Sequence, residues 1–410
     1  MMVFTQSDAR NRVIRMRKFL SILKKKKRKV IGLLSGTSAD GIDACLVEIS
    51  HLEKKIKVAQ LGFKTFPFCA KIQKELLKAA DPTYQNLDEI LRMDVALGEH
   101  FAVAVICLIK SLKLKSTDID LIGSHGQTIR HLPKFTPSLQ RKIRASFQIG
   151  NPSVIASRTG IITVGDFRTS DIAAGGEGAP LSSLGHFILF EKEKTPQAIL
   201  NLGGIANFTI LFGNNKIEDV FGFDTGPSNM VVDSLIQRFF NEKYDKNGKI
   251  AFSGKIHLKL LNILKTNPYL DLKPPKSTGR EEFGEKFVKE ILKYKKRFSI
   301  NAEDVVTAAS ELVVWSIWDA YQRYVMPEIK IKRLIIAGGG AHNRYFIKGL
   351  KQLFYPVEVL TSDKLGFNPD FLESFVFALL ADLTISGSPG NIPRVTGAKK
   401  PAILGKICLP

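Results

Sequence analysis

Three glycine-bearing loops constrain the fold of this 410-residue chain most strongly. They span residues 32–43 (GLLSGTSADGID), 222–229 (GFDTGPSN) and 337–343 (AGGGAHN). Each follows a short apolar run rich in Val, Ile, Leu or Phe, so each is expected to be a turn at the end of a strand. Glycines let backbone N–H groups approach an anion, and hydroxyl side chains add further donors. Three such loops, far apart in sequence, predict one cleft that binds a nucleoside triphosphate and a second substrate.

The composition is that of an ordinary globular protein. Its length suffices for two domains with separate cores, and the apolar and charged fractions, 44% and 24%, are average. No uninterrupted apolar stretch approaches the ~18 residues that a membrane-spanning helix needs. The four cysteines are widely spaced and form no CxxC pair. This spacing disfavours disulfides and structural zinc, and it predicts a cytoplasmic location.

The formal net charge of +21 is concentrated at the N-terminus. Residues 1–29 hold eleven Lys or Arg and a single acidic residue, Asp8. Such a segment can be a nucleic-acid or nuclear-localisation patch, a membrane-surface helix or a mitochondrial presequence. The plainer alternatives are a solvated extension, or an upstream start codon with Met16 as the real start. We interpret residues 1–29 as a disordered extension, and we expect neither nucleic acid nor a membrane as a partner.

Short apolar runs and helical periodicities alternate along the chain. Strands are predicted at 29–34, 45–49, 55–65, 119–123, 147–149 and 161–164, and then at 198–202, 208–212, 217–223, 334–337 and 357–360. Helices are predicted at 87–112, 304–324, 344–354 and 372–385. Each half opens with a series of strands and continues into helices. This pattern indicates an α/β protein with a duplicated βββαβα unit and mainly parallel sheets.

The same pattern predicts two domains. The first is expected to comprise residues 30–170 plus 388–410, and the second residues 171–387. The glycine-rich stretch 175–180 is expected near the connection between them, and the tail after Ser386 is expected to return to the first domain. Asn151, directly before Pro152, is expected to cap a helix.

The first loop has the residues of a phosphate-binding turn. Small and hydroxyl residues that could cradle the β- and γ-phosphates are Ser35, Gly36, Thr37, Ser38 and Gly41. Asp40 or Asp43 could hold Mg²⁺, mostly through water. The alternative is a simple hairpin turn in which aspartate is a turn former. No Gly-Lys-Ser/Thr sequence ends the loop, so it is not a Walker A motif.

The other two loops suggest a base and a nucleoside site. Asp224 follows an apolar strand and precedes a helix, a position that suits a general base; a helix N-cap or a metal ligand is the alternative. Gly338, Gly339 and Gly340 could let an adenine or ribose lie against the backbone. The alternative for these glycines is an ordinary turn between a strand and a helix.

Polar residues between the first two loops are candidates for substrate binding. His125 and His131 lack visible carboxylate or thiol partners for zinc, so His125 is expected to form a hydrogen bond with substrate or within the domain interface. Asp166 and Arg168, with Asp171, could bind sugar hydroxyls or a lactyl carboxylate, because Arg suits carboxylates. A structural salt bridge is the alternative for these residues.

Taken together, these segments resemble the anhydro-N-acetylmuramic acid kinase family of the hexokinase–actin-like ATPase superfamily. The resemblance runs from about residue 30 to residue 405 and lies in the order and number of the matching motifs. These motifs are GLLSGTSADGID (32–43), GSHGQTIRH (123–131), QIGNP (148–152), DFRTSDIAAGGEGAPL (166–181), NLGGIAN (201–207), GFDTGPSN (222–229), PKSTGRE (275–281), AGGGAHN (337–343) and VTGA (395–398).

The resemblance implies roles for particular residues. ATP would be bound by Gly36, Thr37, Ser38, Ala39, Asp40, Gly41, Ile42 and Asp43, and by Gly203, Gly204, Gly226, Gly338, Gly339, Gly340 and Asn343. Mg²⁺ would be held by Asp40 through water. Substrate contacts would come from His125, Gln127, Asn151, Asp166 and Arg168. Asp224 would be the catalytic aspartate, and Glu373, counted with it, a substrate-binding glutamate.

The resemblance also implies a fold and a reaction. The fold would be a two-domain hexokinase/actin-like, ribonuclease H-like duplication with a deep cleft, and the protein would be a homodimer. Asp224 would deprotonate a water that opens the 1,6-anhydro bridge, and O6 would attack the γ-phosphorus of ATP. The products would be N-acetylmuramate 6-phosphate and ADP, in peptidoglycan recycling. Ser228 departs from the family's usual glycine, and residues 1–29 have no counterpart.

Two other functions remain open from the sequence. One is a conventional sugar or carboxylate kinase of the same superfamily, in which Asp224 would deprotonate a hydroxyl directly. The other is a non-enzymatic, actin-like ATP-binding protein.

Overall fold

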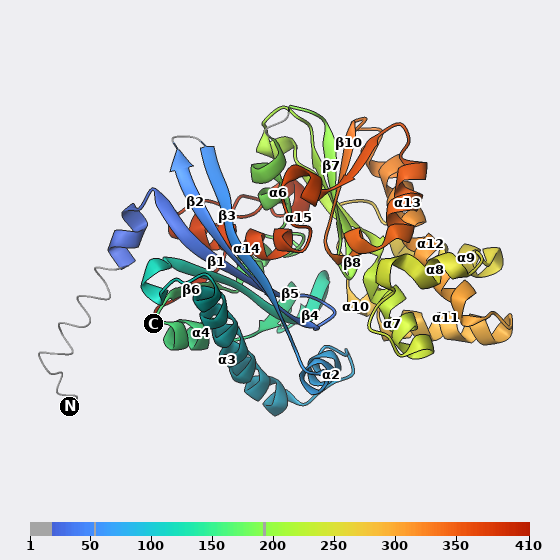
Figure 1. Cartoon of the computed structure of the whole chain (residues 1–410), viewed down its shortest axis with the longest axis horizontal. Coiled ribbons are helices and arrows are strands. Elements are labelled where there is room, and N and C mark those ends of the chain that lie inside the picture. The colour runs from blue at the N-terminus through green and yellow to red at the C-terminus, as the bar shows by residue number, and fades with distance from the viewer. Residues whose placement is uncertain (1–18, 53–54, 192–193) are drawn as a thin grey trace, which may run out of the picture.

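Two β-sheets stand side by side in the computed structural model, which describes residues 19–52, 55–191 and 194–410 (Figure 1). The first sheet has the order β12-β6-β4-β1-β2-β3, with β5 paired to β4, and the second has the order β11-β10-β7-β8-β9. The strands of the first are β1 (Lys27–Ser35), β2 (Gly41–Leu52), β3 (Lys55–Pro67), β4 (Leu121–Ser138), β5 (Arg141–Ile149), β6 (Ile162–Gly165) and β12 (Lys406–Cys408). Those of the second are β7 (Gln197–Leu202), β8 (Ile205–Leu211), β9 (Phe221–Pro227), β10 (Arg333–Ala337) and β11 (Glu358–Thr361).

The predicted duplication is confirmed by the strand order. Reading β3-β2-β1-β4-β6 in one sheet gives the same chain order as β9-β8-β7-β10-β11 in the other. The helices match as well: α3 (Leu87–Ser111) and α12 (Ala302–Ala320) each precede the fourth strand of their unit, and α4 (Pro152–Thr159) and α13 (Arg344–Leu353) each precede the last. The predicted α/β architecture with two domains is therefore present.

The expectation of mainly parallel sheets is wrong. The first three strands of each unit are antiparallel neighbours. Among the strands of the described residues, only the pairs β1–β4, β4–β6, β7–β10 and β10–β11 are parallel. Short turns, such as residues 36–40 and 203–204, join successive strands at the start of each unit. Turns of that length can join only antiparallel strands, whereas a parallel pair needs a longer crossover.

Local signals place the helices well. Helix α3 begins after Asn86, whose side chain accepts a hydrogen bond from the Glu89 N–H, and it ends within one residue of the predicted 112. Helix α12 is followed by a π-helical turn, η6 (Tyr321–Val325), which ends one residue beyond the predicted range 304–324. The other helices are α2 (Ala70–Ala79), α5 (Phe167–Ala173), α6 (Ser183–Phe190), α7 (Asn229–Phe240), α8 (Lys249–Ser253), α9 (Leu258–Leu264), α10 (Arg280–Phe283), α11 (Glu285–Arg297), α14 (Phe371–Ile385) and α15 (Pro393–Thr396).

The last helix of each unit packs on the sheet of the other unit. Helix α14 lies against β1 and β4, where Cβ atoms on Gly32 and Gly123 would come within 2.0 Å of the Ser374 carbonyl oxygen and 1.9 Å of the Phe377 carbonyl oxygen. In return, Ser183 on α6 forms a 2.9 Å hydrogen bond with Thr209 on β8. The sequence analysis assigned α14 to the second domain, residues 171–387. The structure instead packs α14 on the first sheet, because Gly32 and Gly123 allow a very close approach.

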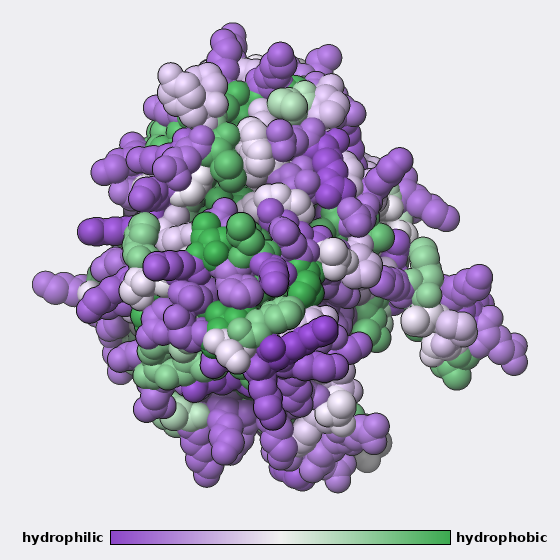
Figure 2. Space-filling view, turned by 90° about the vertical axis from the view of Figure 1, so that its right-hand side faces the viewer, coloured by the Kyte–Doolittle hydropathy of each residue, from purple (hydrophilic) through white to green (hydrophobic). Residues whose placement is uncertain are grey.

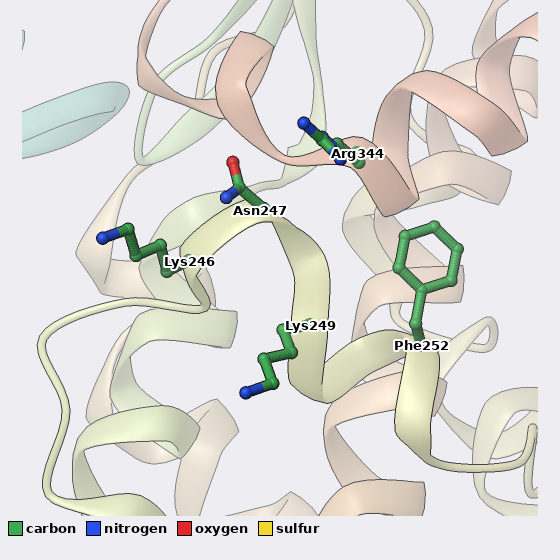
Figure 3. A pocket seen from close by; sticks show the side chains of 5 residues that line it. All are labelled: Lys246, Asn247, Lys249, Phe252 and Arg344. Carbon is green, nitrogen blue, oxygen red and sulfur yellow. The ribbon is translucent and has the colours of Figure 1, made fainter.

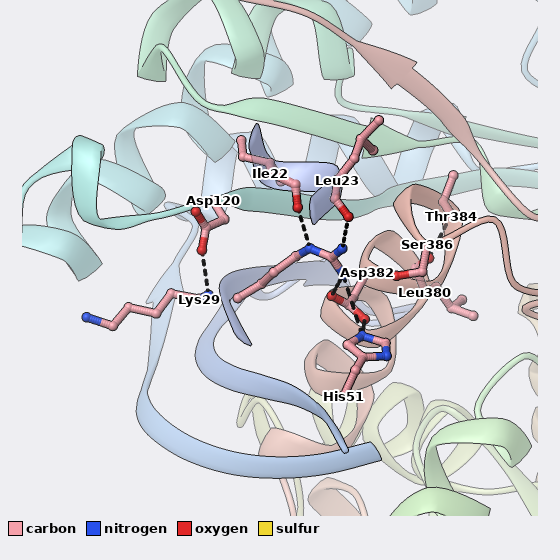
Figure 4. A network of polar contacts seen from close by, with 10 residues as sticks. Ile22, Leu23, Lys29, His51, Asp120, Leu380, Asp382, Thr384 and Ser386 are labelled. Atoms are coloured by element: carbon pink, nitrogen blue, oxygen red, sulfur yellow. Dashed lines mark hydrogen bonds and ion pairs between the residues drawn. The ribbon is translucent and has the colours of Figure 1, made fainter. Parts of the chain in front are cut away.

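Residues 19–29 adopt regular structure, so the prediction of a disordered extension over 1–29 is wrong for these residues. Residues 19–24 are helical, and Ile22, only 2% exposed, belongs to the core. Arg28 lies in β1 and donates hydrogen bonds to the Ile22 carbonyl and to Asp382. Figure 4 shows how Ile22, Leu23, His51 and Asp382 gather there. Residues 1–18 lie outside the described part of the chain.

The C-terminal tail returns to the first domain, as predicted. Strand β12 pairs antiparallel with β6, with Lys406 opposite Gly165. Figure 2 views the molecule from the side of the second domain, where hydrophilic side chains cover most of the surface around smaller hydrophobic areas. Over the described ranges, no helix combines the length and the apolar character that crossing a membrane requires.

Candidate active site

Asp224 lies inside β9 and is held at three of its atoms. Its N–H donates to the Lys276 carbonyl at 3.1 Å, and its own carbonyl accepts from the Tyr269 hydroxyl at 2.8 Å. Its Oδ2 accepts from the Thr278 N–H at 2.9 Å. The residue that caps α7 is Ser228, so the interpretation of Asp224 as an N-cap is wrong. The carboxylate is therefore both buried and fixed in orientation.

Burial makes this carboxylate a suitable proton acceptor near neutral pH. Only 6% of Asp224 is exposed, and the loss of hydration raises its pKa to about 7. The hydrogen bond from the Thr278 N–H and the charge of Arg168 oppose that rise. A group whose pKa lies near the working pH can both accept and release a proton during a reaction.

A half-buried arginine lies beside this carboxylate. The Nε of Arg168 donates to the Nε2 of His125 at 3.0 Å, and its Nη1 donates to the Gly178 carbonyl at 2.8 Å. Burial and the neighbouring guanidinium hold the pKa of His125 well below its usual range, so the ring is neutral. Its Nδ1–H then donates to the Gly126 carbonyl at 3.1 Å. This arrangement leaves Nη2 of Arg168 without a protein partner among the described residues.

The two aspartates near Arg168 are engaged elsewhere. Asp166 forms a 2.5 Å ion pair with Lys406 on β12. Asp171 is fully buried and accepts hydrogen bonds from the Gly178 N–H at 2.8 Å and from Asn391 at 2.6 Å. Within the described chain, Arg168 forms no ion pair, so the salt-bridge interpretation is wrong for it. The proposed substrate contact of Asp166 gains no support, because its carboxylate binds the C-terminal strand.

Two other predicted substrate contacts have structural partners. Asn151 caps α4 by accepting from the Ser153 N–H at 3.0 Å, as the sequence predicted, and its amide donates to Asp94 at 2.8 Å. Both ends of its side chain are thus used within the first domain. Gln127 is buried and accepts from the Ser35 hydroxyl at 2.6 Å, which joins β4 to the end of β1. A substrate role for either residue stays a prediction.

The first loop is a hairpin turn that touches the second domain. It joins the antiparallel strands β1 and β2, as predicted. A Cβ on Gly204, in the equivalent turn between β7 and β8, would lie 2.0 Å from the Thr37 hydroxyl. By contrast, no atom lies within 4 Å of the position of a Cβ on Gly36. The two equivalent turns therefore meet at the domain junction, with open space beside Gly36.

Carboxylates gather next to this loop. Burial, together with the charges of Glu373 and Asp40, raises the pKa of Asp43 to about 7, although the Thr65 hydroxyl donates to it at 2.6 Å. Glu373, in the first turn of α14, accepts from the Asn201 amide at 2.6 Å, and burial raises its pKa as well. In the described ranges, no three His, Cys, Asp or Glu side chains are placed to hold a metal ion directly.

Two glycines of the third loop are required for packing, and one leaves room. A Cβ on Gly338, whose φ is +78°, would lie 2.5 Å from Asn201 Oδ1, and a Cβ on Gly340 would lie 2.5 Å from the Leu202 Cβ. Gly339 has only the Asn229 amide near it, at 4.0 Å. Asn343 caps α13 by accepting from the Tyr345 N–H at 3.0 Å, so its side-chain oxygen has a structural role.

Two further glycines line the inner side of the junction or the core. A Cβ on Gly203 would lie 3.3 Å from Glu373 Oε1, which places the β7–β8 turn next to α14. Gly226 faces the second core, because its Cβ would approach Leu270 and Ser316 at 3.0 and 3.2 Å. The nucleotide contact predicted for Gly226 therefore gains no support from its surroundings.

A cavity of about 380 Å³ opens immediately after the third loop. It is lined by Lys246, Asn247, Lys249, Phe252 and Arg344 (Figure 3). Arg344 is the first residue of α13, and the others come from the turn before α8 and from α8 itself. The lining combines three cationic side chains with one aromatic ring.

Sequence reasoning missed the residues that hold Asp224. Tyr269, Lys276 and Thr278 lie about fifty residues after it, and Ser277 donates to Glu177 at 2.6 Å near the connection between the domains. The sequence signal for Lys276 and Thr278 was the family motif PKSTGRE (275–281), to which the sequence analysis assigned no role. Asn201, the partner of Glu373, lies likewise in the matched NLGGIAN motif.

A family model and several known proteins, all described as anhydro-N-acetylmuramic acid kinase, match nearly the whole chain. A family model described as anhydro-N-acetylmuramic acid kinase matches residues 28–410. The anhydro-N-acetylmuramic acid kinase of Caldanaerobacter subterraneus subsp. tengcongensis is 43% identical over 396 residues, which cover 96% of this chain and 100% of that protein. The protein of the same name from Clostridioides difficile is 40% identical over 378 residues, which cover 92% of this chain and 97% of that protein. The protein of the same name from Salinibacter ruber is 37% identical over 391 residues, which cover 95% of this chain and 98% of that protein.

Proposed function

The chain belongs to the anhydro-N-acetylmuramic acid kinase family, and on that premise we propose how it performs the family's reaction. It is an ATP-dependent kinase that opens 1,6-anhydro-N-acetylmuramic acid and phosphorylates O6, in the recycling of peptidoglycan. One observation carries the assignment of its centre. The buried carboxylate of Asp224, with a pKa raised to about 7, lies beside the guanidinium of the half-buried Arg168.

Asp224 is the general base of the first step. It takes a proton from water, and the water oxygen bonds to the anomeric carbon while the bond from that carbon to O6 breaks. O6 then forms its bond to the γ-phosphorus of ATP, and the bond from that phosphorus to the β,γ-bridging oxygen breaks, which releases ADP. One water is consumed, and one proton leaves the site. Fixed orientation and charge stabilisation are the main needs of such a phosphoryl transfer.

Arg168 binds the lactyl carboxylate of the sugar. The residue is half-buried and carries no ion pair within the described residues, and the neutral ring of His125 holds its Nε. Burial lowers the pKa of Arg168 to about 10, against the attraction of Asp224. A carboxylate ligand would form an ion pair with the guanidinium of Arg168 and accept a hydrogen bond from its Nη2.

The phosphates of ATP lie along residues 36–43, and the nucleoside end enters the cavity at Arg344. The open space beside Gly36 supports the first placement. The second is supported by the position of the cavity, directly after the third loop, and by its lining of three cations and Phe252. Cationic and aromatic side chains stack well on a nucleobase.

Mg²⁺ fits the charge of this region, held by Asp40 through water. Asp40 is exposed, and its charge raises the pKa values of Asp43 and Asp233, so the region carries surplus negative charge. When bound with ATP, the ion supplies charge neutralisation at the phosphates.

Two broader expectations belong to this proposal. The protein acts in the cytoplasm, which its four free cysteines support, since thiols persist in reducing compartments. It acts as a homodimer, the assembly that the family resemblance implies. Light scattering coupled to size-exclusion chromatography gives the mass directly, and a monomer at micromolar concentration would overturn the dimer.

The reaction itself is tested by substrate comparison. The protein is incubated with ATP and either 1,6-anhydro-N-acetylmuramic acid or ordinary N-acetylmuramic acid, and sugar phosphate is measured by mass spectrometry. We expect N-acetylmuramate 6-phosphate from the anhydro sugar and little product from the open one. Equal or faster phosphorylation of the open sugar would favour a conventional sugar kinase instead.

A further inference from the structure

Lys276 is a buried cation that the proposed reaction does not use. Only 4% of the residue is exposed. Its Nζ lies 3.4 Å from the carbonyl oxygens of both Tyr269 and Leu270, in the 3₁₀ turn η5 (Pro268–Asp271). The same ammonium lies over the rings of Tyr269 and Tyr324, at 4.7 and 5.4 Å from their centroids. A buried ammonium needs such compensation, because an unpaired charge in the interior is costly.

The ammonium joins the two ends of the segment that holds Asp224. Tyr269, at one end, donates its hydroxyl to the Asp224 carbonyl. Lys276, at the other end, accepts the Asp224 N–H with its own carbonyl, and Thr278 donates to Oδ2 two residues later. Among the described residues, every hydrogen bond that reaches Asp224 from outside its own sheet thus comes from residues 269–278.

We propose that Lys276 is a positioning residue for the reaction, because its ammonium fixes the segment 269–278 that orients the carboxylate of Asp224. The proposal rests on the proposed role of Asp224 as the base. Lys276 touches neither substrate nor nucleotide in it. The ammonium ties the Tyr269 end to the Thr278 end, so that three donors and acceptors meet one residue with fixed geometry. A base that is free to turn loses much of its effect, since small displacements of a reacting group lower rates steeply.

The charges around Lys276 also act on Asp224. Burial is the largest cause that lowers the pKa of Lys276, to about 8, and Arg323 of η6 lowers it further. The carboxylates that face it are those of Asp224 on β9, Asp319 on α12 and Asp271 on η5, and all three oppose the shift. The attraction between Lys276 and Asp224 is mutual, so loss of the ammonium favours the protonated form of Asp224.

The test is Lys276→Met in the full chain, with Lys273→Met as the matched control. Both substitutions remove one cation from the same segment, but Lys273 is exposed. For Lys276→Met we expect kcat to fall by roughly 10- to 10²-fold, while the affinity for a non-hydrolysable ATP analogue stays within about two-fold. We also expect the acid limb of the pH profile of kcat/KM to move to higher pH, and Lys276→Arg to move it back. Lys273→Met should change none of these quantities.

Several outcomes decide the matter. A Lys276→Met protein with unchanged kcat and an unmoved acid limb would overturn the proposal, and so would an equal loss in Lys273→Met. If Lys276→Met does not fold, Tyr269→Phe removes only the hydroxyl that donates to Asp224; kcat should then fall with KM for ATP unchanged, and an unchanged kcat would count against the proposal. Asp224→Asn separates a failure of the proposed base from a failure of the proposed role of Lys276. If that variant keeps its turnover, the proposed base fails, whereas an inactive Asp224→Asn with a fully active Lys276→Met rejects the role of Lys276 alone.

Discussion

The guanidinium of Arg28 lies 2.8 Å from Oδ1 of Asp382, and both side chains are almost wholly buried, at 3% and 0% exposed. The other carboxylate oxygen of Asp382 lies 2.6 Å from His51 Nε2. Arg28 belongs to the basic N-terminal segment. Asp382 lies on α14, the helix that carries Glu373 in its first turn (Figure 4). The end of the basic segment is therefore part of the support of the site.

Arg28→Met should destabilise the protein strongly. Removing one partner of a buried ion pair costs about 3–5 kcal/mol. Asp382 would keep its contact with His51 but lose the guanidinium that balances its charge. Chemical denaturation measures this cost as a lower midpoint with an unchanged slope. Lys26→Met, at an exposed position two residues away, is the control and should stay within about 0.5 kcal/mol of the parent. Equal midpoints for both variants would show that the pair contributes nothing.

Gly36→Ala should weaken ATP binding and leave stability unchanged. No atom lies within 4 Å of the new Cβ and φ is not positive, so the folded protein gains no strain. The methyl group would occupy the space proposed for a phosphate and would cost at least one hydrogen bond, so we expect affinity to fall by roughly ten-fold. Calorimetry with a non-hydrolysable analogue measures this effect. Unaltered affinity would place the phosphates elsewhere.

Arg168→Lys should discriminate between sugars. Lysine keeps the charge but loses the planar fork that binds a carboxylate with two hydrogen bonds. KM for anhydro-N-acetylmuramic acid should rise by roughly ten-fold, while kcat/KM for the analogue that lacks the lactyl group should hardly change. A similar loss for both sugars would mean that Arg168 maintains the site and does not bind the lactyl carboxylate.

The raised pKa of Asp224 predicts a pH-dependent gain in stability for Asp224→Asn. The carboxyl titrates near 3.8 when unperturbed and near 7 in the folded protein. Between these values the folded protein binds a proton that the unfolded chain lacks, so stability falls as pH rises through this window. The variant, which cannot ionise there, should have a higher unfolding midpoint than the parent at pH 8 and an equal one at pH 4. A lower midpoint at pH 8 would contradict the raised pKa.

Local features of the sequence predicted most strands, the turn at residues 36–40 and the duplication. The turn expected at residues 222–229 is wrong, because Asp224 lies within the strand β9 (Phe221–Pro227). The turn at residues 36–40 and the helix capped by Asn151 depend on neighbouring residues alone, and both are as expected. Asp224 was found for the same reason, since its position after an apolar run is visible in the sequence. Apart from the hairpin at residues 36–40, the reversal of strand direction in the first three strands of each unit was missed, although the absence of helices between those strands was available as a signal.

Contacts between distant segments could not be predicted. The close approach of α14 to Gly32 requires that two halves of the chain exchange their last helices, and no local pattern encodes that exchange. Arg28 belongs to a run of cations that is usually solvated, and only Asp382, 354 residues away, gives it a buried partner. The clamp of Asp224 by Lys276 and Thr278 is equally non-local. The ion pair of Asp166 with Lys406 likewise required the position of the C-terminal strand.

The central claim is that Asp224 is the base that activates water, and turnover by Asp224→Asn at saturating ATP and anhydro sugar tests it most directly. Asparagine keeps the size of the side chain and an oxygen for the Thr278 N–H, but it cannot accept the proton. With affinity for the ATP analogue preserved, we predict that kcat falls by roughly 10²- to 10⁴-fold, the usual weight of a general base. Turnover equal to that of the parent, with the same affinity, would contradict the claim.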